Sequence, residues 1–486
     1  MNDRALRQLV DSLASAVIAA NRDDLRTVED RLGALRGDQW LHFDDLSRQY
    51  NLYTPSPLSQ ITVWPAEVLQ VTEPTVAIAA SVSRDGHVRE RALAWLGCLR
   101  GPAPAAAVAV RVNDWVRPVA LAARRLVSRF DAADELAAVI AVMLRLTHRR
   151  RGGAWAQVYL DEIAAGPQDQ LLALTSVGER AVRLWALEAA ADREQLAADA
   201  LLDRALADPD PVLAVWSAQR LLSAEQPGTC AWSARLVTSR RAAVRALAWS
   251  ALPEEALGRE QLAARLLDPS GAVRSVARWC WTRLWGTPAD QYRQALATST
   301  RPSILAAALD GLRECAAENT DADAQAFLTH PSPRVRTTAV RILGHRAAHQ
   351  QGPIEPLLPL LADPSNRVVR TATRYLQERA GEVPVTVLTT LEADPDPRSR
   401  RTALSLHQRL GPWERVRSDL RAMHDPDQDL ARTARTDLLA WLQHDACRTY
   451  SRPTQDQASD IAQNLTTVAL TEHQRREVAF VAGLHR

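Results

Sequence analysis

Three arginines in the C-terminal half of the chain recur at a fixed spacing: Arg370, Arg401 and Arg432 (401 − 370 = 31, 432 − 401 = 31). Arg341 and Arg374 form a second, shorter series. If each arginine lies on an equivalent helix of a stack, the guanidinium groups align in a column that points away from the core. Such a column can bind phosphates or the acidic face of a protein. The alternative is a solvated surface, because arginine supplies all 59 Lys-plus-Arg positions of this chain.

Tryptophans form a comparable series in the N-terminal half. Trp155, Trp185 and Trp216 are separated by 30 and 31 residues (185 − 155 = 30, 216 − 185 = 31). Two interpretations remain open. The indoles can pack between successive repeats, or they can line a groove that holds a peptide side chain or a flipped base. We favour packing.

Catalytic or metal-binding patterns are scarce. His345 and His349 have the spacing of a two-histidine metal site, but no third ligand is evident. The absence of lysine excludes a catalytic lysine. Asp161 and Glu162 form an acidic cluster near Trp155 and Tyr159, and we find no glycine-rich phosphate loop or nucleophile motif. The sequence therefore predicts a protein that is not an enzyme, with no catalytic residue, no cofactor and no metal.

A repeated phrase must position these residues. Asp-Pro or His-Pro is followed five residues later by an apolar residue and nine residues later by a small one, with a period of about 31 residues. The six clear copies begin at Asp208, Asp268, His330, Asp363, Asp394 and Asp425. Asp-Pro starts a helix, and the apolar and small positions share one helical stripe. A second apolar helix precedes it, as in residues 356–361. No unit buries its stripe alone, so neighbouring units must stack.

Arginine also recurs six residues after the start of the phrase. We expect these side chains to be buried and to pair with the turn aspartate of the same or a neighbouring repeat, a structural role rather than a ligand-binding one. Weaker copies of the repeat lack the Asp-Pro or His-Pro start but keep the same spacing of apolar residue, arginine and small residue. The series comprises Arg89, Arg117, Arg183, Arg245, Arg274, Arg336 and Arg400.

The order Asp-Pro, Val-Arg, Ala resembles the HEAT repeat, in the short form common in bacterial proteins. The resemblance covers roughly residues 76–450. It implies an all-α fold, a right-handed α-α superhelix of about twelve helix pairs. Residues 451–486 are expected to form a C-terminal helical cap, with helices near 455–466 and 471–484.

Residues 1–75 do not fit the repeat. We expect helices over 1–20 and 22–36, followed by a less regular stretch. An atypical N-terminal helical cap is the favoured interpretation. A docking segment is the alternative, because aromatic residues are dense there: Trp40, Phe43, Tyr50, Tyr53 and Trp64.

Composition narrows the class further. The net charge of +2 is low for a protein steered globally to nucleic acid. Arginine in place of lysine is typical of a GC-rich bacterial genome, although selection against lysine is an alternative. The five scattered cysteines favour a reducing cytoplasm. No signal peptide or membrane-spanning run is predicted.

We therefore expect a cytoplasmic, non-enzymatic scaffold or adaptor that binds a protein partner on the inner face of a solenoid. One alternative is a nucleic-acid-binding protein related in fold to the HEAT-like alkylpurine DNA glycosylases, whose catalytic motif does not map onto this chain. A second is an accessory protein of specialised metabolism.

Overall fold

The computed structural model describes residues 2–19, 21–48, 58, 73–226, 230–348 and 352–484. In these ranges the regular structure is entirely helical, which confirms the expected fold class. The chain divides into two compact units, Met1–Ser223 and Ala224–Arg486. The boundary falls within the predicted 76–450 array, whose continuity stays a prediction. Of the helices in these ranges, none is long and apolar enough to cross a membrane.

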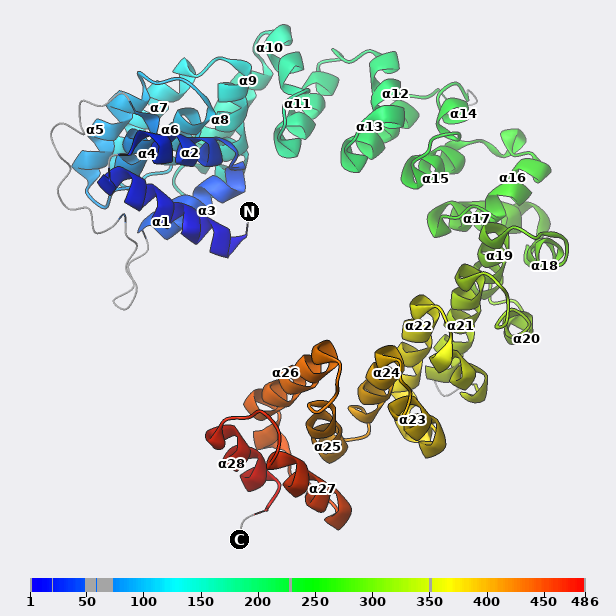
Figure 1. Cartoon of the computed structure of the whole chain (residues 1–486). Coiled ribbons are helices and arrows are strands. Elements are labelled where there is room, and N and C mark those ends of the chain that lie inside the picture. Colours follow the sequence, from blue (N-terminus) through cyan, green and yellow to red (C-terminus); the bar gives the residue numbers. More distant parts are fainter. Residues whose placement is uncertain are drawn as a thin grey trace. The chain divides into compact units, whose positions relative to one another are not determined.

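The first unit begins with three helices and continues as short helices joined by tight turns (Figure 1). Its α-helices are α1 Asp3–Ala19, α2 Arg22–Gly33, α3 Gly37–Arg48, α4 Pro74–Ser81, α5 Gly86–Leu96, α6 Pro102–Arg111, α7 Arg117–Leu126, α8 Ala133–Leu146, α9 Gly153–Ala164, α10 Gln168–Leu174, α11 Arg180–Asp192, α12 Ala198–Ala207 and α13 Pro211–Ser223.

The second unit arranges its helices in chain order, with neighbours in contact such as α18 with α19, α21 with α22 and α25 with α26 (Figure 1). Its elements are α14 Ser233–Leu236, α15 Ala242–Ala251, α16 Arg259–Leu266, α17 Gly271–Trp285, α18 Ala289–Thr298, α19 Pro302–Glu314, α20 Thr320–Gln325, α21 Pro333–Ala348, the 3-10 helix η5 Glu355–Ala362, α22 Asn366–Leu376, α23 Val385–Glu392, α24 Pro397–His407, α25 Pro412–Ala422, α26 Gln428–His444, α27 Gln455–Leu465 and α28 Glu472–Val481.

The repeat phrase builds the turn and the second helix of each pair. In α21, Val335 and Ala339 occupy the apolar and small positions, and both are fully buried. Because Ala339 is small, the neighbouring helices approach closely. The first helix of the following pair is less regular than predicted. Residues 355–362 form a 3-10 helix rather than an α-helix, since Pro359 lacks the N–H that an α-helix would use.

The less regular stretch expected after residue 36 is wrong for residues 37–48, which form helix α3. Trp40, Phe43 and Leu46 recur every three residues, and all are buried against α1, α6 and α8. Gly37 at the start of α3 lies so close to α8 that a Cβ there would stand 1.9 Å from the carbonyl oxygen of Ala141. Trp40 and Phe43 are thus core residues. Tyr50, Tyr53 and Trp64, the other aromatics of the docking hypothesis, lie outside the described residues.

The C-terminal helices agree with expectation. Helices α27 and α28 fall within the predicted ranges 455–466 and 471–484. Each begins with a reciprocal cap in which a threonine accepts from a glutamine N–H three residues later and the glutamine side chain accepts in return. Ile461 and Val478 pack with Trp441 of α26 in one apolar cluster. The role of residues 451–486 as a C-terminal cap stays a prediction.

Candidate functional site

Buried Arg–Asp contacts connect successive repeats. Arg336 of α21 donates from Nε and Nη2 to the two carboxylate oxygens of Asp363, both at 2.8 Å. Its Nη1 donates to the backbone carbonyls of His330 and Pro331 at 2.8 and 2.9 Å. Asp363 also accepts the N–H of Ser365 at 2.8 Å. One guanidinium therefore joins the turn of its own repeat to the turn of the next.

The same geometry recurs in both units. In each case the arginine donates to two backbone carbonyls of its own turn and to the turn aspartate that comes 23 to 27 residues later. The aspartate always belongs to the following repeat, so of the two partners expected from the sequence only the neighbouring one is used. The pairs are Arg89–Asp114, Arg245–Asp268, Arg336–Asp363 and Arg400–Asp425.

Three members of the predicted arginine series differ. Arg183 lies farther from its carboxylates, 3.8 Å from Asp208 and 3.5 Å from Asp210. Arg274 is buried but pairs with Glu314 of α19 at 2.6 Å, because the next turn carries Ser299 in place of aspartate.

The assignment of Arg117 to this series is wrong. Asp114 is the turn residue that accepts from Arg89, so the apolar and small positions of α7 are the buried Val119 and Ala123. Arg117 is exposed at the first position of α7. The sequence Val116-Arg117 imitates the phrase three residues too early.

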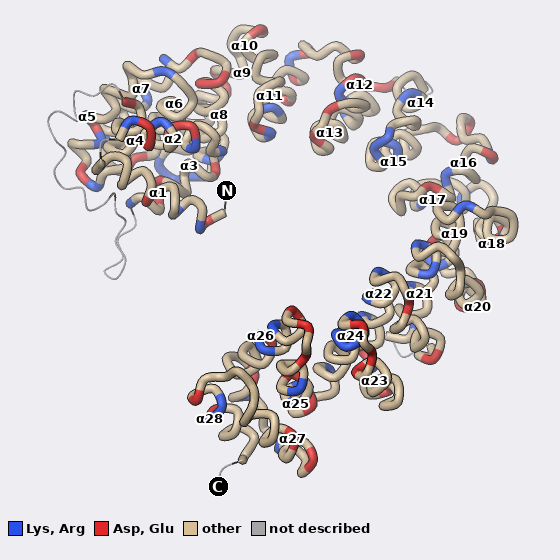
Figure 2. The backbone as a smooth tube through the Cα atoms, in the orientation of Figure 1, with Lys and Arg blue, Asp and Glu red and all other residues tan. Residues whose placement is uncertain are grey.

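The candidate binding surface lies on the second helices of the C-terminal repeats. We call it the Arg face and define it by seven of the exposed or half-exposed arginines of α21, α22, α24 and α26. Figure 2 shows basic positions on these helices. Its members are Arg334, Arg341, Arg367, Arg370, Arg374, Arg401 and Arg432.

Carboxylates neutralise part of the Arg face. Arg341 lies 2.5 Å from Asp310, Arg401 lies 3.5 Å from Asp427, and Arg432 lies 3.1 Å from Asp429. These three side chains are at least 39% exposed, so each contact contributes little to stability. They also leave little net positive charge at α24 and α26.

The remaining charge is concentrated on α21 and α22. Arg334, Arg367, Arg370 and Arg374 are exposed, and no carboxylate of the described residues forms an ion pair with any of them. Arg370 donates only to the carbonyl of Asn366 at 3.4 Å, and the guanidinium of Arg374 stands 5.2 Å from the ring of Tyr375. Arg334 and Arg367 were not among the predicted binding residues, although their spacing of 33 matches the local repeat (367 − 334 = 33).

The tryptophan series is half-buried. Trp185 and Trp216 each occupy the sixth residue of their helix, whereas Trp155 is the third residue of α9. Trp155 therefore does not occupy the equivalent position that was predicted. Its ring stacks on Tyr159 with centroids 5.5 Å apart. Trp185 contacts the apolar core and also lines an open groove of ≈ 580 Å³ beside Asp161 and Glu188.

Two buried polar clusters lie in the C-terminal repeats. His407 stands 2.7 Å from Glu392 and 3.1 Å from Glu414. Burial acts to lower the pKa of His407, but the two carboxylates outweigh it and raise the pKa to about 9. Burial likewise acts to raise the pKa of Glu414, but hydrogen bonds from His407 and Arg417 hold it at about 2. The histidine is therefore a charged structural group at neutral pH.

Asp419 of α25 is fully buried. Burial, together with the neighbouring carboxylate of Asp437, raises its pKa to about 8. Gln408 donates to Asp419 at 2.7 Å, and Arg415 holds Asp437 at 2.6 Å. The pair thus shares one proton near neutral pH, with Asp437 as the carboxylate.

Among the described residues, no group of three or more His, Cys, Asp or Glu side chains is placed to hold a metal ion. His349, the second histidine of the predicted spacing, lies outside the described residues.

Comparison with known proteins locates the repeat. A family model for HEAT repeats matches residues 289–377, the segment that contains α18 to α22. No curated protein sequence matches the chain. The segment that matches the repeat thus carries Arg334, Arg367, Arg370 and Arg374.

Solved structures with a similar arrangement include two complexes of Kap95p, with RanGDP and with Nup1. They are 14% identical to this chain over 99% of its length, with TM-scores of 0.35 and 0.33. The karyopherin Kap121p bound to the extreme C-terminus of the phosphatase Cdc14p is 14% identical, with a TM-score of 0.25. The chain spans 66% of the length of Kap95p and 51% of that of Kap121p.

Proposed function

Because the chain contains HEAT repeats, we propose that it is a non-enzymatic scaffold that binds an acidic segment of a protein partner on the Arg face. The observation that carries this proposal is the set of four exposed, unneutralised arginines on α21 and α22. Elsewhere in the same repeats, arginines are matched with carboxylates, as in Arg336–Asp363 and Arg401–Asp427. An unmatched cluster of guanidinium groups attracts carboxylates from another molecule.

Rigid support favours binding at this surface. Arg336 ties α21 to the turn before α22, and the buried Val368, Ala372 and Leu376 fix α22 against its neighbours. The four guanidinium groups are therefore presented on anchored helices, which lowers the ordering cost of binding. The planar fork of arginine pairs with a carboxylate through two hydrogen bonds, so glutamate- and aspartate-rich segments suit the surface.

Direct binding tests the proposal. Fluorescence anisotropy would be recorded with a labelled poly-glutamate peptide and with a single-stranded oligonucleotide of equal charge. We expect the peptide to bind more tightly at equal salt, and its affinity to fall as salt screens the charges. Tighter binding of the oligonucleotide would contradict the proposal and indicate that the ligand is a nucleic acid.

Matched variants locate the surface. In the test variant, all four arginines of α21 and α22 become glutamine: Arg334→Gln, Arg367→Gln, Arg370→Gln and Arg374→Gln. The control removes the same charge from exposed arginines of the first unit: Arg117→Gln, Arg125→Gln, Arg145→Gln and Arg150→Gln. We expect the test variant to lose peptide binding and the control to retain it. Equal loss in both would show that net charge, not the Arg face, attracts the peptide.

A further inference from the structure

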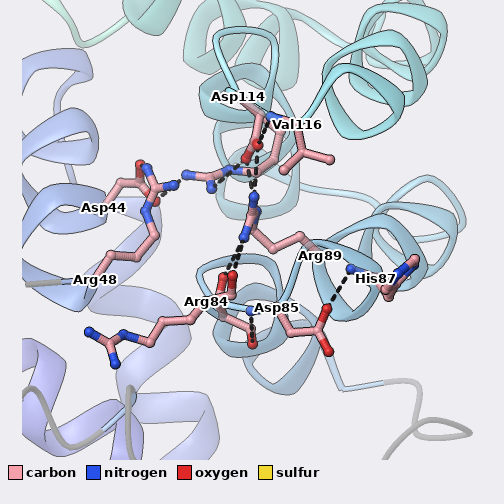
Figure 3. Close-up of polar contacts among 10 residues, drawn as sticks. Asp44, Arg48, Arg84, Asp85, His87, Arg89, Asp114 and Val116 are labelled. Carbon is pink, nitrogen blue, oxygen red and sulfur yellow. Dashed lines mark hydrogen bonds and ion pairs between the residues drawn. The ribbon is translucent and has the colours of Figure 1, made fainter. Parts of the chain in front are cut away.

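A series of buried ion pairs lies in the first unit. Only the pair at one end of this series is a repeat contact of the kind described above. Five side chains alternate in sign, in the order Arg48, Asp44, Arg111, Asp114, Arg89. Figure 3 shows Asp44 and Arg48 on one side and Arg89 and Asp114 on the other. Arg89 and Asp114 form a repeat contact, whereas Asp44 and Arg48 come from α3. Helix α3 thus adds a second Arg–Asp pair beside the Arg89–Asp114 contact.

The charges of this chain do not cancel. Three arginines and two aspartates leave a net charge of 3 − 2 = +1. The side chains of Arg89 and Asp114 are 0% exposed, that of Arg111 is 1% and that of Arg48 is 16%. An uncompensated charge removed from water is costly unless another group neutralises it. Burial lowers the pKa of Arg48, and the neighbouring charge of Arg111 lowers it further.

Both carboxylates are already paired with arginines, although Oδ1 of Asp44 makes no hydrogen bond. Asp114 accepts from Arg89 at 2.8 and 2.9 Å, from Arg111 at 3.2 Å and from the N–H of Val116 at 2.9 Å. Asp44 is paired with Arg48 through one oxygen and with Arg111 through the other. Two buried donors remain without a hydrogen-bond partner among the described residues: Nη1 of Arg48 and Nε of Arg111.

A small cavity lies beside these donors. Its volume is ≈ 50 Å³, and its lining includes Arg48, Arg111, Asp44 and Asp114. Exposed Asp45 and Arg149 also line it, and their opposite charges cancel. A single water needs a space of about 10–15 Å³ on this measure, so the cavity has room for a small ion.

We propose that this cavity binds a small inorganic anion, of which chloride is the probe of choice. The anion accepts from Nη1 of Arg48 and Nε of Arg111 and neutralises the excess charge of the five-residue chain. It thereby strengthens the attachment of α3 to the first repeats. This site is independent of the Arg face, which lies in the other unit.

Thermal melting tests the site in the full-length protein. Sodium gluconate, whose anion is much larger than chloride, would be replaced stepwise by sodium chloride at constant ionic strength. A ligand that binds only the folded state raises the melting temperature in a saturable manner. We expect such a rise for the native chain. Identical melting in gluconate and chloride would overturn the proposal.

Variants separate the site from general salt effects. Arg48→Met removes one donor and the excess charge, while Arg125→Met removes an exposed arginine of the same unit. We expect the chloride-dependent rise to vanish in the first variant and to persist in the second. Equal responses in both would contradict the assignment.

A direct measurement covers the case in which Arg48→Met is poorly folded. The ³⁵Cl NMR line broadens when chloride exchanges with a protein site. We expect the native chain to broaden the line, and Arg48→Lys, which keeps the charge, to do the same. Added bromide should compete for the site and reduce the broadening. A line that the native protein leaves unbroadened would refute chloride binding.

Discussion

Arg336 and Asp363 lie in different repeats, yet their side chains meet through two hydrogen bonds of 2.8 Å each. The side-chain hydrogen bonds that Arg336 donates to Asp363 raise the pKa of Arg336 above its ordinary value. Because the same arginine also donates to two carbonyls of its own turn, the contact determines how one repeat is placed on the next. The stack therefore depends on polar contacts at its turns as well as on apolar packing between helices.

Replacing Arg336 tests this contact. Arg336→Met leaves Asp363 and two turn carbonyls without their donor, and we expect a loss of about 3 kcal/mol in the free energy of unfolding. Arg334→Met, two residues earlier on the exposed side of α21, should change it by less than about 0.5 kcal/mol. Urea unfolding monitored by circular dichroism measures both. Equal effects of the two substitutions would show that the Arg336–Asp363 contact does not contribute to the free energy of unfolding.

The charged His407 predicts a loss of stability at alkaline pH. Its pKa is raised to about 9 in the folded state, above its ordinary value of 6.5. The contribution is therefore complete below pH 6.5 and disappears as the pH rises through 9. Over this window we expect about 2–3 kcal/mol to be lost in the native chain. His407→Gln should remove this part of the pH dependence, as measured by urea midpoints across the window; an unchanged slope would contradict it.

Asp419 predicts a stabilising substitution. Its pKa is about 8 when folded, against an ordinary value of 3.8, so its contribution is present at low pH and is lost as the pH rises toward 8. Asp419→Asn keeps an oxygen for Gln408 and an N–H for Asp437, without the buried negative charge. At pH 8 we expect a higher melting temperature than in the native chain, and near pH 4 little difference. A lower melting temperature at pH 8 would rule out the shared proton.

Trp185 distinguishes packing from binding in the first unit. It contacts the apolar core and also lines the groove beside Asp161 and Glu188. If packing dominates, Trp185→Ala should cost roughly 3–5 kcal/mol of stability. We expect this result, because the ring is half-buried against Ala-rich helices. An unshifted melting curve combined with weaker partner binding would instead assign the ring to recognition.

The repeat contacts could be predicted from the sequence because they follow from its period. A period of about 31 residues less the six residues from turn to arginine gives about 25, and Arg400 and Asp425 are 25 apart (425 − 400 = 25). The misplaced Arg117 shows the limit of the template. Val116-Arg117 satisfies the local pattern, but only the position of Asp114 in the turn decides the register.

Other groups could not be predicted because they meet only in the folded chain. Arg48 and Asp44 belong to a helix outside the repeat pattern and reach Arg111 through the packing of α3 on α6. Asp419 contacts Gln408 and Asp437 from two other segments, so no single spacing reveals its shared proton. The distinction between neutralised and unneutralised arginines likewise depends on aspartates at the following turns, such as Asp427 beside Arg401.

The turn contact also bears on how a chain of this kind can change length during evolution. Removing residues 363–393 would delete one whole repeat of 31 residues (393 − 363 + 1 = 31) and bring Asp394 to the position that Asp363 now occupies. Arg336 would then find an equivalent acceptor in Asp394. Duplication would work in the same way. Each Arg–Asp contact between turns can therefore form equally well with another repeat. Whole repeats can be gained or lost, whereas a partial repeat would leave the arginine without its aspartate.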